Sequence, residues 1–517
     1  MPTSISSNKE QATGNRSRRG HAASSAVLRR ACAVALACYL ILGPCNLRAT
    51  PETPLTLETA IELALQHNQR IKVSAFGPDI ARANVLAEYG RFDPSLTFNR
   101  AYGETETPGA LLPPATRPLV QTDSYSLTLD GLAPWGLSYS LGATAENQRG
   151  TTNAFSDNYA TFGGVTVTQP LLRGFGFGAN LAGLRIAKAN RGISDWQHRQ
   201  TVIDTVTAVV YAFNNLQQAR ENVRIARLSR DLAAQLLDEN QKRHRVGAIS
   251  DADVTQARAR VATREESILL TEQAARDLEN QLRLLIGETE FPVHGAAIPL
   301  APLPAAGEVE VNAAADVKVA YAQRPDYQAA RLGVTVTRAQ QVAAQNALLP
   351  RLDFVGSYGY GGLDPVFRTA RTQVRDEDAR AYSVGMVVKI PLAFTEGRGR
   401  ARAARLALRQ AEADLVRLEQ DIAVSVAATA GQIETTRARV AATRQAFELQ
   451  QQALRDEQKK FKAGTSSTFF VLQEQELLAA AENNYARAQA DQRRAIASYD
   501  RETGRTLEHY QLTIAQH

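Results

Sequence analysis

The sequence has no cysteine after residue 45. Its three cysteines, Cys32, Cys38 and Cys45, all lie within the first 49 of 517 residues. If that segment is removed on export, the mature chain contains no thiol at all. Disulfide bonds and thiol chemistry are therefore excluded from the mature protein.

The chain also lacks an excess charge outside its first residues and lacks long apolar runs. Residues 1–49 carry seven basic residues and one acidic residue, which accounts for the whole formal net charge of +6. The balanced remainder does not favour a nucleic-acid partner. No run of 18 apolar residues follows, so no transmembrane helix is expected, although a secreted chain can still enter a membrane as a β-barrel.

The first 49 residues have the pattern of a secretory signal peptide. Arg29 and Arg30 precede an apolar run over residues 31–43, which is too short to span a bilayer. We expect cleavage near Ala49. Residues 42–45 also resemble a lipoprotein cleavage box, so lipidation of Cys45 is an alternative, although proline at position 44 fits that box poorly.

A very long helical hairpin dominates the mature chain. Residues 179–244 contain no proline, and apolar residues recur at helical spacing, for example at Val202, Val206 and Val209. At about 1.5 Å per residue this helix is roughly 100 Å long. The turn 245–250 leads into a return helix that ends before Gly287.

The hairpin and the segment before it both occur twice. A shift of 217 residues places Gly247 on Gly464, and a shift of 256 places Pro94 on Pro350. We interpret the chain as an internal duplication. The expected divisions are a signal peptide (1–49), a first repeat (50–290, with strands 95–169 and a hairpin 179–287), an extended linker (291–312), a second repeat (313–504, with strands 351–394 and a hairpin 397–504) and a C-terminal tail (505–517).

In each repeat a helix precedes segments with a period of two. The first such helix is expected over residues 57–89, broken or kinked near Gly77-Pro78. Four candidate strands follow in the first repeat and two in the second, apolar on one face and rich in Ser, Thr and Gly on the other, as in transmembrane β-barrels. In the last strand, expected to run to Phe394, residues 384, 386, 388 and 390 would face lipid. The charged loop before it, residues 371–378, is interpreted as solvated rather than cation-binding.

Patterns that would suggest catalysis are weak. The glycines of residues 174–178 match neither the phosphate-loop nor the dinucleotide spacing. The seven histidines show no metal-ligand spacing. Ser194, Asp195 and His198 share a helix turn without a nucleophile elbow. We therefore expect no enzyme, no metal site and no cofactor.

The lengths of the helices favour an oligomer. The outgoing helix matches the return helix and the preceding helix stacked end to end, so each repeat would present two parallel rods. Four rods with apolar residues on more than one face cannot all be buried in a monomer. A closed ring of several subunits would bury them.

The mature sequence resembles the TolC-type outer-membrane efflux family over nearly its whole length. The most specific segments are residues 169–176, 245–254 and 462–473. The resemblance implies a mainly α fold with a membrane β-barrel, in which a homotrimer forms a 12-stranded barrel in outer-membrane lipid and a helical tunnel across the periplasm. It implies that the hairpin tips dock on a periplasmic adaptor protein, which connects to an inner-membrane pump. The residues that fall on the family's tip motif are Val246, Gly247, Ala248, Ser250, Ala463, Gly464, Thr465 and Ser467.

Two departures limit the resemblance. Where the best-known members carry two aspartates past the second tip, this chain has Phe470 and Gln473. We expect a hydrophobic gate at Phe470, the alternative being sideways packing on a neighbouring helix. Six strand candidates stand in place of four, so the hairpin 125–147 either widens the barrel or extends outside it.

The expected function is a passive exit duct in the outer membrane of a Gram-negative-type bacterium, serving a tripartite efflux or type I secretion system. The alternative is a periplasmic coiled-coil scaffold with a soluble β domain.

Overall fold

The computed structural model describes residues 54–107, 118–288, 297–304, 306–307 and 309–513. Residues 55–517 form one compact unit. The expected signal peptide, with Cys45, lies outside the described residues.

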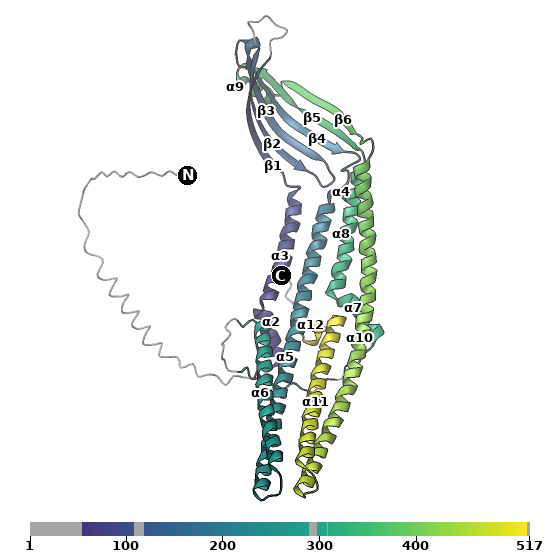
Figure 1. Cartoon of the computed structure of the whole chain (residues 1–517). Coiled ribbons are helices and arrows are strands. Elements are labelled where there is room, and N and C mark those ends of the chain that lie inside the picture. The colour runs from purple at the N-terminus through teal and green to yellow at the C-terminus, as the bar shows by residue number, and fades with distance from the viewer. Residues whose placement is uncertain (1–53, 108–117, 289–296, 305, 308, 514–517) are drawn as a thin grey trace, which may run out of the picture. The chain divides into compact units, whose positions relative to one another are not determined.

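The elements follow the order expected from the sequence, with helices and strands alternating in two series (Figure 1). The first series is α2 (Leu57–His67), α3 (Gln69–Gly90), β1 (Ser95–Glu106), β2 (Leu119–Leu132), β3 (Ser138–Gly150), η1 (Thr151–Asn153), β4 (Tyr159–Pro170), α4 (Phe177–Asn180), α5 (Ala182–Arg245) and α6 (Asp251–Leu285). The second is α7 (Ala313–Gln323), α8 (Pro325–Ala347), β5 (Arg351–Asp364), α9 (Phe367–Arg375), β6 (Ala379–Lys389), α10 (Thr395–Lys462), α11 (Thr468–Thr503) and α12 (Thr506–His509).

The strands form a single antiparallel sheet in the order β1-β2-β3-β4-β5-β6. The hairpin of β2 and β3 lies inside this sheet, between β1 and β4, and is not an external extension. Since side chains alternate along each strand, the register assigns the two faces. One face carries mainly apolar and aromatic residues and the other mainly Ser, Thr and Gly. We call them the apolar face (Leu96, Phe98, Leu127, Leu129, Leu141, Val165, Val167, Tyr358, Tyr382, Val384, Met386, Val388) and the polar face.

The last strand is shorter than expected. It ends at Lys389, whereas the sequence pattern predicted a strand as far as Phe394. Pro391 has no N–H to donate to a neighbouring strand, and Phe394 has a positive φ of 52° as the residue that precedes α10. The alternation of apolar and polar residues in the sequence therefore extends beyond Lys389, where the strand ends.

The long helices α5 and α10 run the length of the helical part (Figure 1). Helix α5 has 64 residues, and its apolar positions at helical spacing are fully buried, among them Val206, Phe213 and Leu216. These residues pack against α2 and the ends of α6 and α11 in one hydrophobic core. Within the described residues, the structure contains no helix that is both long enough and apolar enough to cross a membrane.

The helix before the first strand is interrupted at Asn68, whereas the helix is continuous through Gly77-Pro78, so the break expected there is wrong. The Asn68 side chain accepts hydrogen bonds from the backbone of Arg70 and Ile71 and so caps the start of α3. Pro78 lies inside α3, which continues to Gly90. The side-chain cap, rather than the proline, determines where this helix is interrupted.

Candidate functional site

The first hairpin tip is a tight turn held by backbone hydrogen bonds. Helix α5 ends as Gly247 N donates to His244 O over 2.9 Å and Ala248 N donates to Arg243 O over 2.9 Å. Gly247 has φ +73°, a region that residues with a Cβ rarely adopt. Ser250 then caps α6: its Oγ accepts from Asp253 N, and its own N donates to the Asp253 carboxylate. Val246 is 79% exposed, so this turn presents an apolar side chain to its surroundings.

The second tip repeats this geometry. Gly464 has φ +79°, Thr465 N donates to Lys460 O over 3.0 Å, and α11 starts after Ser467. Ser467 accepts no side-chain capping bond, unlike Ser250. The adjacent Ser466 hydroxyl instead donates to the Glu457 carboxylate. The eight residues predicted for docking thus lie in two turns of the same shape.

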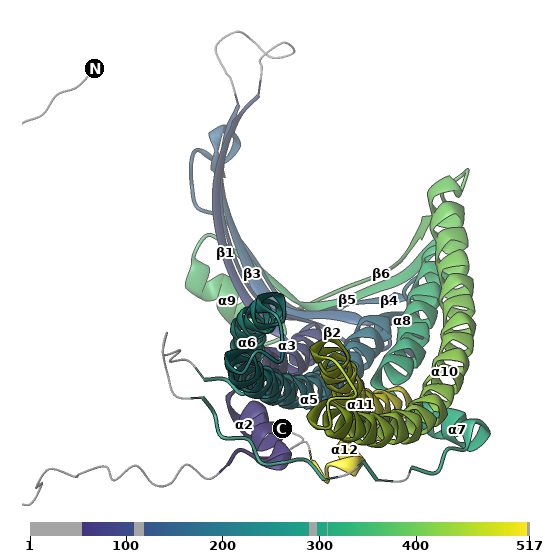
Figure 2. The same ribbon diagram turned by 60° about the horizontal axis from the view of Figure 1, so that its bottom comes forward.

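The two tips lie side by side, because the hairpins brace one another just above the turns (Figure 2). The Arg243 guanidinium lies 4.1 Å from the centre of the Phe461 ring and donates to Phe461 O over 3.1 Å. Phe461 itself is buried. Thr468 donates to the buried Asn240 side chain over 3.4 Å. No local sequence pattern marks these residues, because their partners are more than 200 positions away.

The predicted gate residues lie on the first turns of α11. Phe470 is 52% exposed and stacks edge to face on Phe469, with the ring centres 5.6 Å apart. Gln473 is exposed one turn further on, and the half-exposed Leu477 continues the same stripe. If Phe470 packed sideways against a neighbouring helix of its own chain, its side chain would be buried, whereas it is half exposed.

A second tie between the hairpins involves charge. The Glu476 carboxylate on α11 accepts from Arg260 of α6 over 2.5 Å and lies 3.5 Å from Arg264. Glu482, also on α11, pairs with Arg224 of α5. These ion pairs join the two hairpins along their length below the core.

Each return helix ends where the helix before the strands is interrupted. In the first repeat, Asn68 Nδ2 donates to Leu285 O at the end of α6 over 2.8 Å. In the second, Arg324 Nη1 donates to Glu502 O at the end of α11 over 3.2 Å. The shifts of 256 and 217 residues relate these four positions, so the two junctions are structural equivalents.

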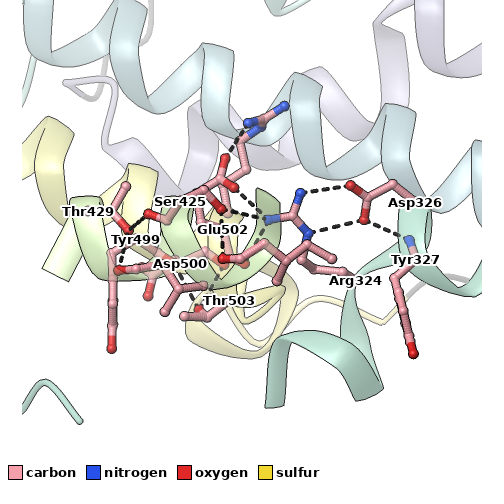
Figure 3. Close-up of polar contacts among 12 residues, drawn as sticks. Arg324, Asp326, Tyr327, Ser425, Thr429, Tyr499, Asp500, Glu502 and Thr503 are labelled. Carbon is pink, nitrogen blue, oxygen red and sulfur yellow. Dashed lines mark hydrogen bonds and ion pairs between the residues drawn. The ribbon is translucent and has the colours of Figure 1, made fainter. Parts of the chain in front are cut away.

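The Arg324 junction is more elaborate than its counterpart (Figure 3). Its guanidinium binds Asp326 through two nitrogens, over 2.7 and 3.1 Å, and Glu502 Oε2 over 2.6 Å. Another contact, at 3.4 Å, reaches Ser425 of α10. Burial raises the pKa of Asp326, but the hydrogen bonds and charge of Arg324 outweigh it, so this pKa lies below its ordinary value. One side chain therefore joins α7, α8, α10 and α11.

A pocket of about 590 Å³ lies beside the start of α5 and includes Asp195 and His198 in its lining. His198 Nδ1 is 2.8 Å from the hydroxyl of Ser74 on α3, so this histidine links two helices. Within the part of the chain that the structure describes, no group of three or more His, Cys, Asp or Glu residues is arranged to hold a metal ion.

The fold and the site together define a class of protein. Its members have long helical hairpins with exposed, neighbouring turns at one end and an antiparallel sheet with an apolar face at the other. The chain belongs to the family of outer membrane efflux proteins, whose family model matches residues 132–288 and 317–504. Members of this family form trimeric channels, which are not enzymes and which work with periplasmic adaptor proteins and inner-membrane pumps.

Individual relatives agree with this assignment. The pyoverdine export outer membrane protein OpmQ of Pseudomonas aeruginosa is 27% identical over 236 residues. That match spans 46% of this chain and 47% of OpmQ, so the chain covers about half the length of this curated relative.

Solved channel structures share the fold. The CmeC outer membrane channel of Campylobacter jejuni has a TM-score of 0.65 at 14% identity, covering 87% of this chain and 86% of that one. The outer membrane protein VceC of Vibrio cholerae has a TM-score of 0.63 at 18% identity, covering 87% and 96%. The family and fold class expected from the sequence are confirmed, and so is an outer-membrane efflux role at the level of the family.

Proposed function

We propose that this protein is the outer-membrane exit duct of a tripartite efflux or type I secretion system, acting as a homotrimer without chemistry of its own. The observation that carries the proposal is the pairing of two bare hairpin tips at one end with a sheet that has one apolar and one polar face at the other. Such a sheet suits a barrel with lipid outside and water inside.

Two aromatic zones support the membrane placement. Near the end of the sheet that adjoins the helices, Trp135 and Phe177 meet edge to face, with ring centres 6.5 Å apart, and both are exposed. Towards the other end, Tyr358 and Tyr382 pair in register on the apolar face. Aromatic residues concentrate at both borders of a membrane-spanning band because their amphipathic rings suit the headgroup level.

The exposed tip residues support docking on an adaptor. Val246 is largely exposed, and among the described residues a side chain added at Gly247 or Gly464 would meet only open space. The hydrogen bonds of each turn fix its shape in advance. A preorganised apolar turn binds a partner with little loss of conformational freedom. The adaptor, and the inner-membrane pump behind it, would select the cargo.

The division into two repeats, residues 50–290 and 313–504, is part of the proposal. The equivalence of the junctions at Asn68 and Arg324 supports it, as does the common order of helix, strands and helical hairpin. A duplicated chain in a trimer gives a tunnel of six similar hairpins.

The stripe of Phe470, Gln473 and Leu477 supports a gate near the tips. These side chains remain exposed on α11, and an apolar constriction can close a pore by expelling water.

The test is a deletion strain complemented with the full chain beside its own adaptor and pump. We expect detergent-dependent, heat-modifiable protein in the outer-membrane fraction and restored export. Val246→Asp should abolish capture of the adaptor without changing membrane insertion. The control, Leu449→Asp, replaces an exposed apolar residue of α10 outside the tips and should leave capture intact. Water-soluble monomeric protein would contradict the proposal and favour the scaffold alternative.

A further inference from the structure

Helix α9 lies in the loop between β5 and β6, where the sequence predicted only a solvated loop. It has nine residues and is strongly two-sided. Ala370 and Val374 lie on one side, whereas Arg368, Arg371 and Arg375 recur every three or four residues on the other. All three arginines are exposed, and the side chain of Arg375 is 86% exposed.

Contacts with β4 show which face of the sheet the helix covers. Thr161 Oγ1 donates to Ala370 O over 3.0 Å, and the Tyr159 and Phe367 rings lie 5.5 Å apart. Thr161 and Tyr159 alternate in phase with Val165, so they belong to the apolar face. Helix α9 therefore lies on the face that would contact lipid, not on the face that would line the channel.

The height of α9 follows from the register. On β6 the apolar face extends from Val388 to Tyr382, and Arg380 is the next residue on that face. The seven residues from Tyr382 to Val388, at about 3.3 Å each and tilted by about 40°, give an apolar band roughly 18 Å tall, somewhat below the ~25 Å of outer-membrane barrels. Ala370 contacts Thr161 and Gly362, which pair with each other across β4 and β5. This pair is the next one on the apolar face after Tyr360, the partner of Arg380, in the direction away from the long helices. The helix thus lies just above the band, at the end of the sheet remote from the long helices (Figure 1).

Among the described residues, the ion pairs of the three arginines are confined to Arg375. Asp376 lies 3.8 Å from Arg375. Asp364 accepts from Val366 N, and Glu377 is hydrogen-bonded to the Tyr360 hydroxyl. Asp378 lies in the same turn. Arg368 and Arg371 form no ion pair with any residue in the described ranges.

We propose that the arginine side of α9 binds phosphate groups of lipids in the outer leaflet of the outer membrane. The inference rests on the proposed membrane placement and adds a ligand to it. Arginine suits this partner because its planar guanidinium binds phosphate through two hydrogen bonds. An amphipathic helix with a basic side is also the element that lies in a headgroup layer.

The test uses the purified full-length trimer in detergent with two probes, bisphosphorylated lipid A and the same lipid with both phosphates removed. Binding would be measured by native mass spectrometry. We expect the phosphorylated lipid to bind at least roughly tenfold more tightly, and the Arg368→Gln/Arg371→Gln/Arg375→Gln variant to lose at least roughly tenfold in affinity for it. Binding should weaken as salt is raised.

A matched variant controls for the loss of three charges. Arg402, Arg405 and Arg409 are exposed on α10, beyond the opposite end of the apolar face, and their replacement by glutamine should leave lipid binding unchanged. If the α9 glutamine variant fails to assemble, the triple lysine variant keeps the charge and should retain most of the binding. Equal affinity for the two lipids, or unchanged affinity in an assembled α9 glutamine variant, would overturn the inference.

This failure would be distinguishable from a failure of the proposed function. A chain absent from the outer-membrane fraction contradicts the exit duct itself. A chain that inserts and exports normally, yet ignores lipid phosphate, contradicts only the role of α9.

Discussion

If three copies close the sheet into a ring, β6 of one copy must pair with β1 of the next, and the strand lengths predict the register of that seam. Within one chain, a row of paired residues leads from Phe98 on β1 to Arg380 on β6. If the row continued unshifted into the next copy, Arg380 would face Phe98, and most of β6 would extend past the start of β1. A shift of six residues instead pairs Arg380 with Glu104 and Lys389 with Ser95, so that β6 is paired over its whole length.

The shift is consistent with barrel geometry and with side-chain chemistry. It must be an even number, because an odd shift would place apolar residues on the polar face. Three chains of six strands give 18 strands, about 86 Å around at ~4.8 Å each, and three shifts of six residues amount to about 60 Å along the strands. The resulting tilt is about 35°, within the range of outer-membrane barrels. The same register opposes Glu104 to Arg380 and Tyr102 to Tyr382.

Cysteine cross-linking tests the register. Phe98 should face Met386 of the next copy at a Cα separation of about 5 Å, which suits a disulfide. Within one chain these residues lie on opposite edges, five strand spacings or about 24 Å apart, so no intrachain bond can form. In a Cys45→Ser background, Phe98→Cys/Met386→Cys should give covalent trimers on non-reducing gels after oxidation of outer membranes.

Two control pairs accompany this experiment. Phe98→Cys with Val387→Cys should not cross-link, since residue 387 lies on the polar face. Preferential cross-linking of residue 98 with Val388 would mean a shift of eight and would refute the argument from strand length. Absence of any covalent oligomer from correctly inserted Phe98→Cys/Met386→Cys protein would refute the seam.

The remaining predictions concern the helices. Arg324→Ala should lower the local stability of its junction, measured by hydrogen exchange, by about 3 kcal/mol, because two carboxylates lose their shared cation. Asn68→Ala at the equivalent junction should cost only about 1 kcal/mol. Equal losses in the two variants would contradict the difference between the junctions. Phe470→Ala should raise the open probability in planar bilayers, and an unchanged value would count against the gate. His509 Nδ1 lies 3.0 Å from the Asp500 carboxylate, and this carboxylate raises the pKa of His509. The contribution of this pair to stability is therefore present below pH ~6.5 and is lost as pH rises through the folded pKa. The wild-type melting temperature should fall over that range, and His509→Asn should remove this slope.

The long helices could be predicted because their signal is repeated many times. The sequence predicted a helix over residues 179–244, and the structure has α5 from Ala182 to Arg245. Sixty residues of apolar period without proline leave few alternative conformations. The tips could be located for a similar reason, since glycine and a capping serine mark a turn between two such periods.

Short and tertiary features could not be predicted in this way. Helix α9 has only two turns, and its apolar residues are hidden among charges in a segment interpreted as a solvated loop. The break at Asn68 depends on a side chain that caps one helix and binds another, so local rules favoured the nearby proline instead. The brace of Arg243 on Phe461 joins residues that the fold alone brings together. The hairpin of β2 and β3 was recognised, but its place inside the sheet required the pairing of β3 with β4.

The β2–β3 hairpin also constrains how the outer opening of such a barrel can evolve. Neighbouring strands must alternate in direction, and the two edges of each chain must meet antiparallel, so a gene can gain strands only two at a time. In a ring of three chains, each insertion of two strands per chain adds six strands to the circumference of the barrel. A lineage could therefore enlarge the outer opening in a single insertion while its helical conduit keeps its original bore.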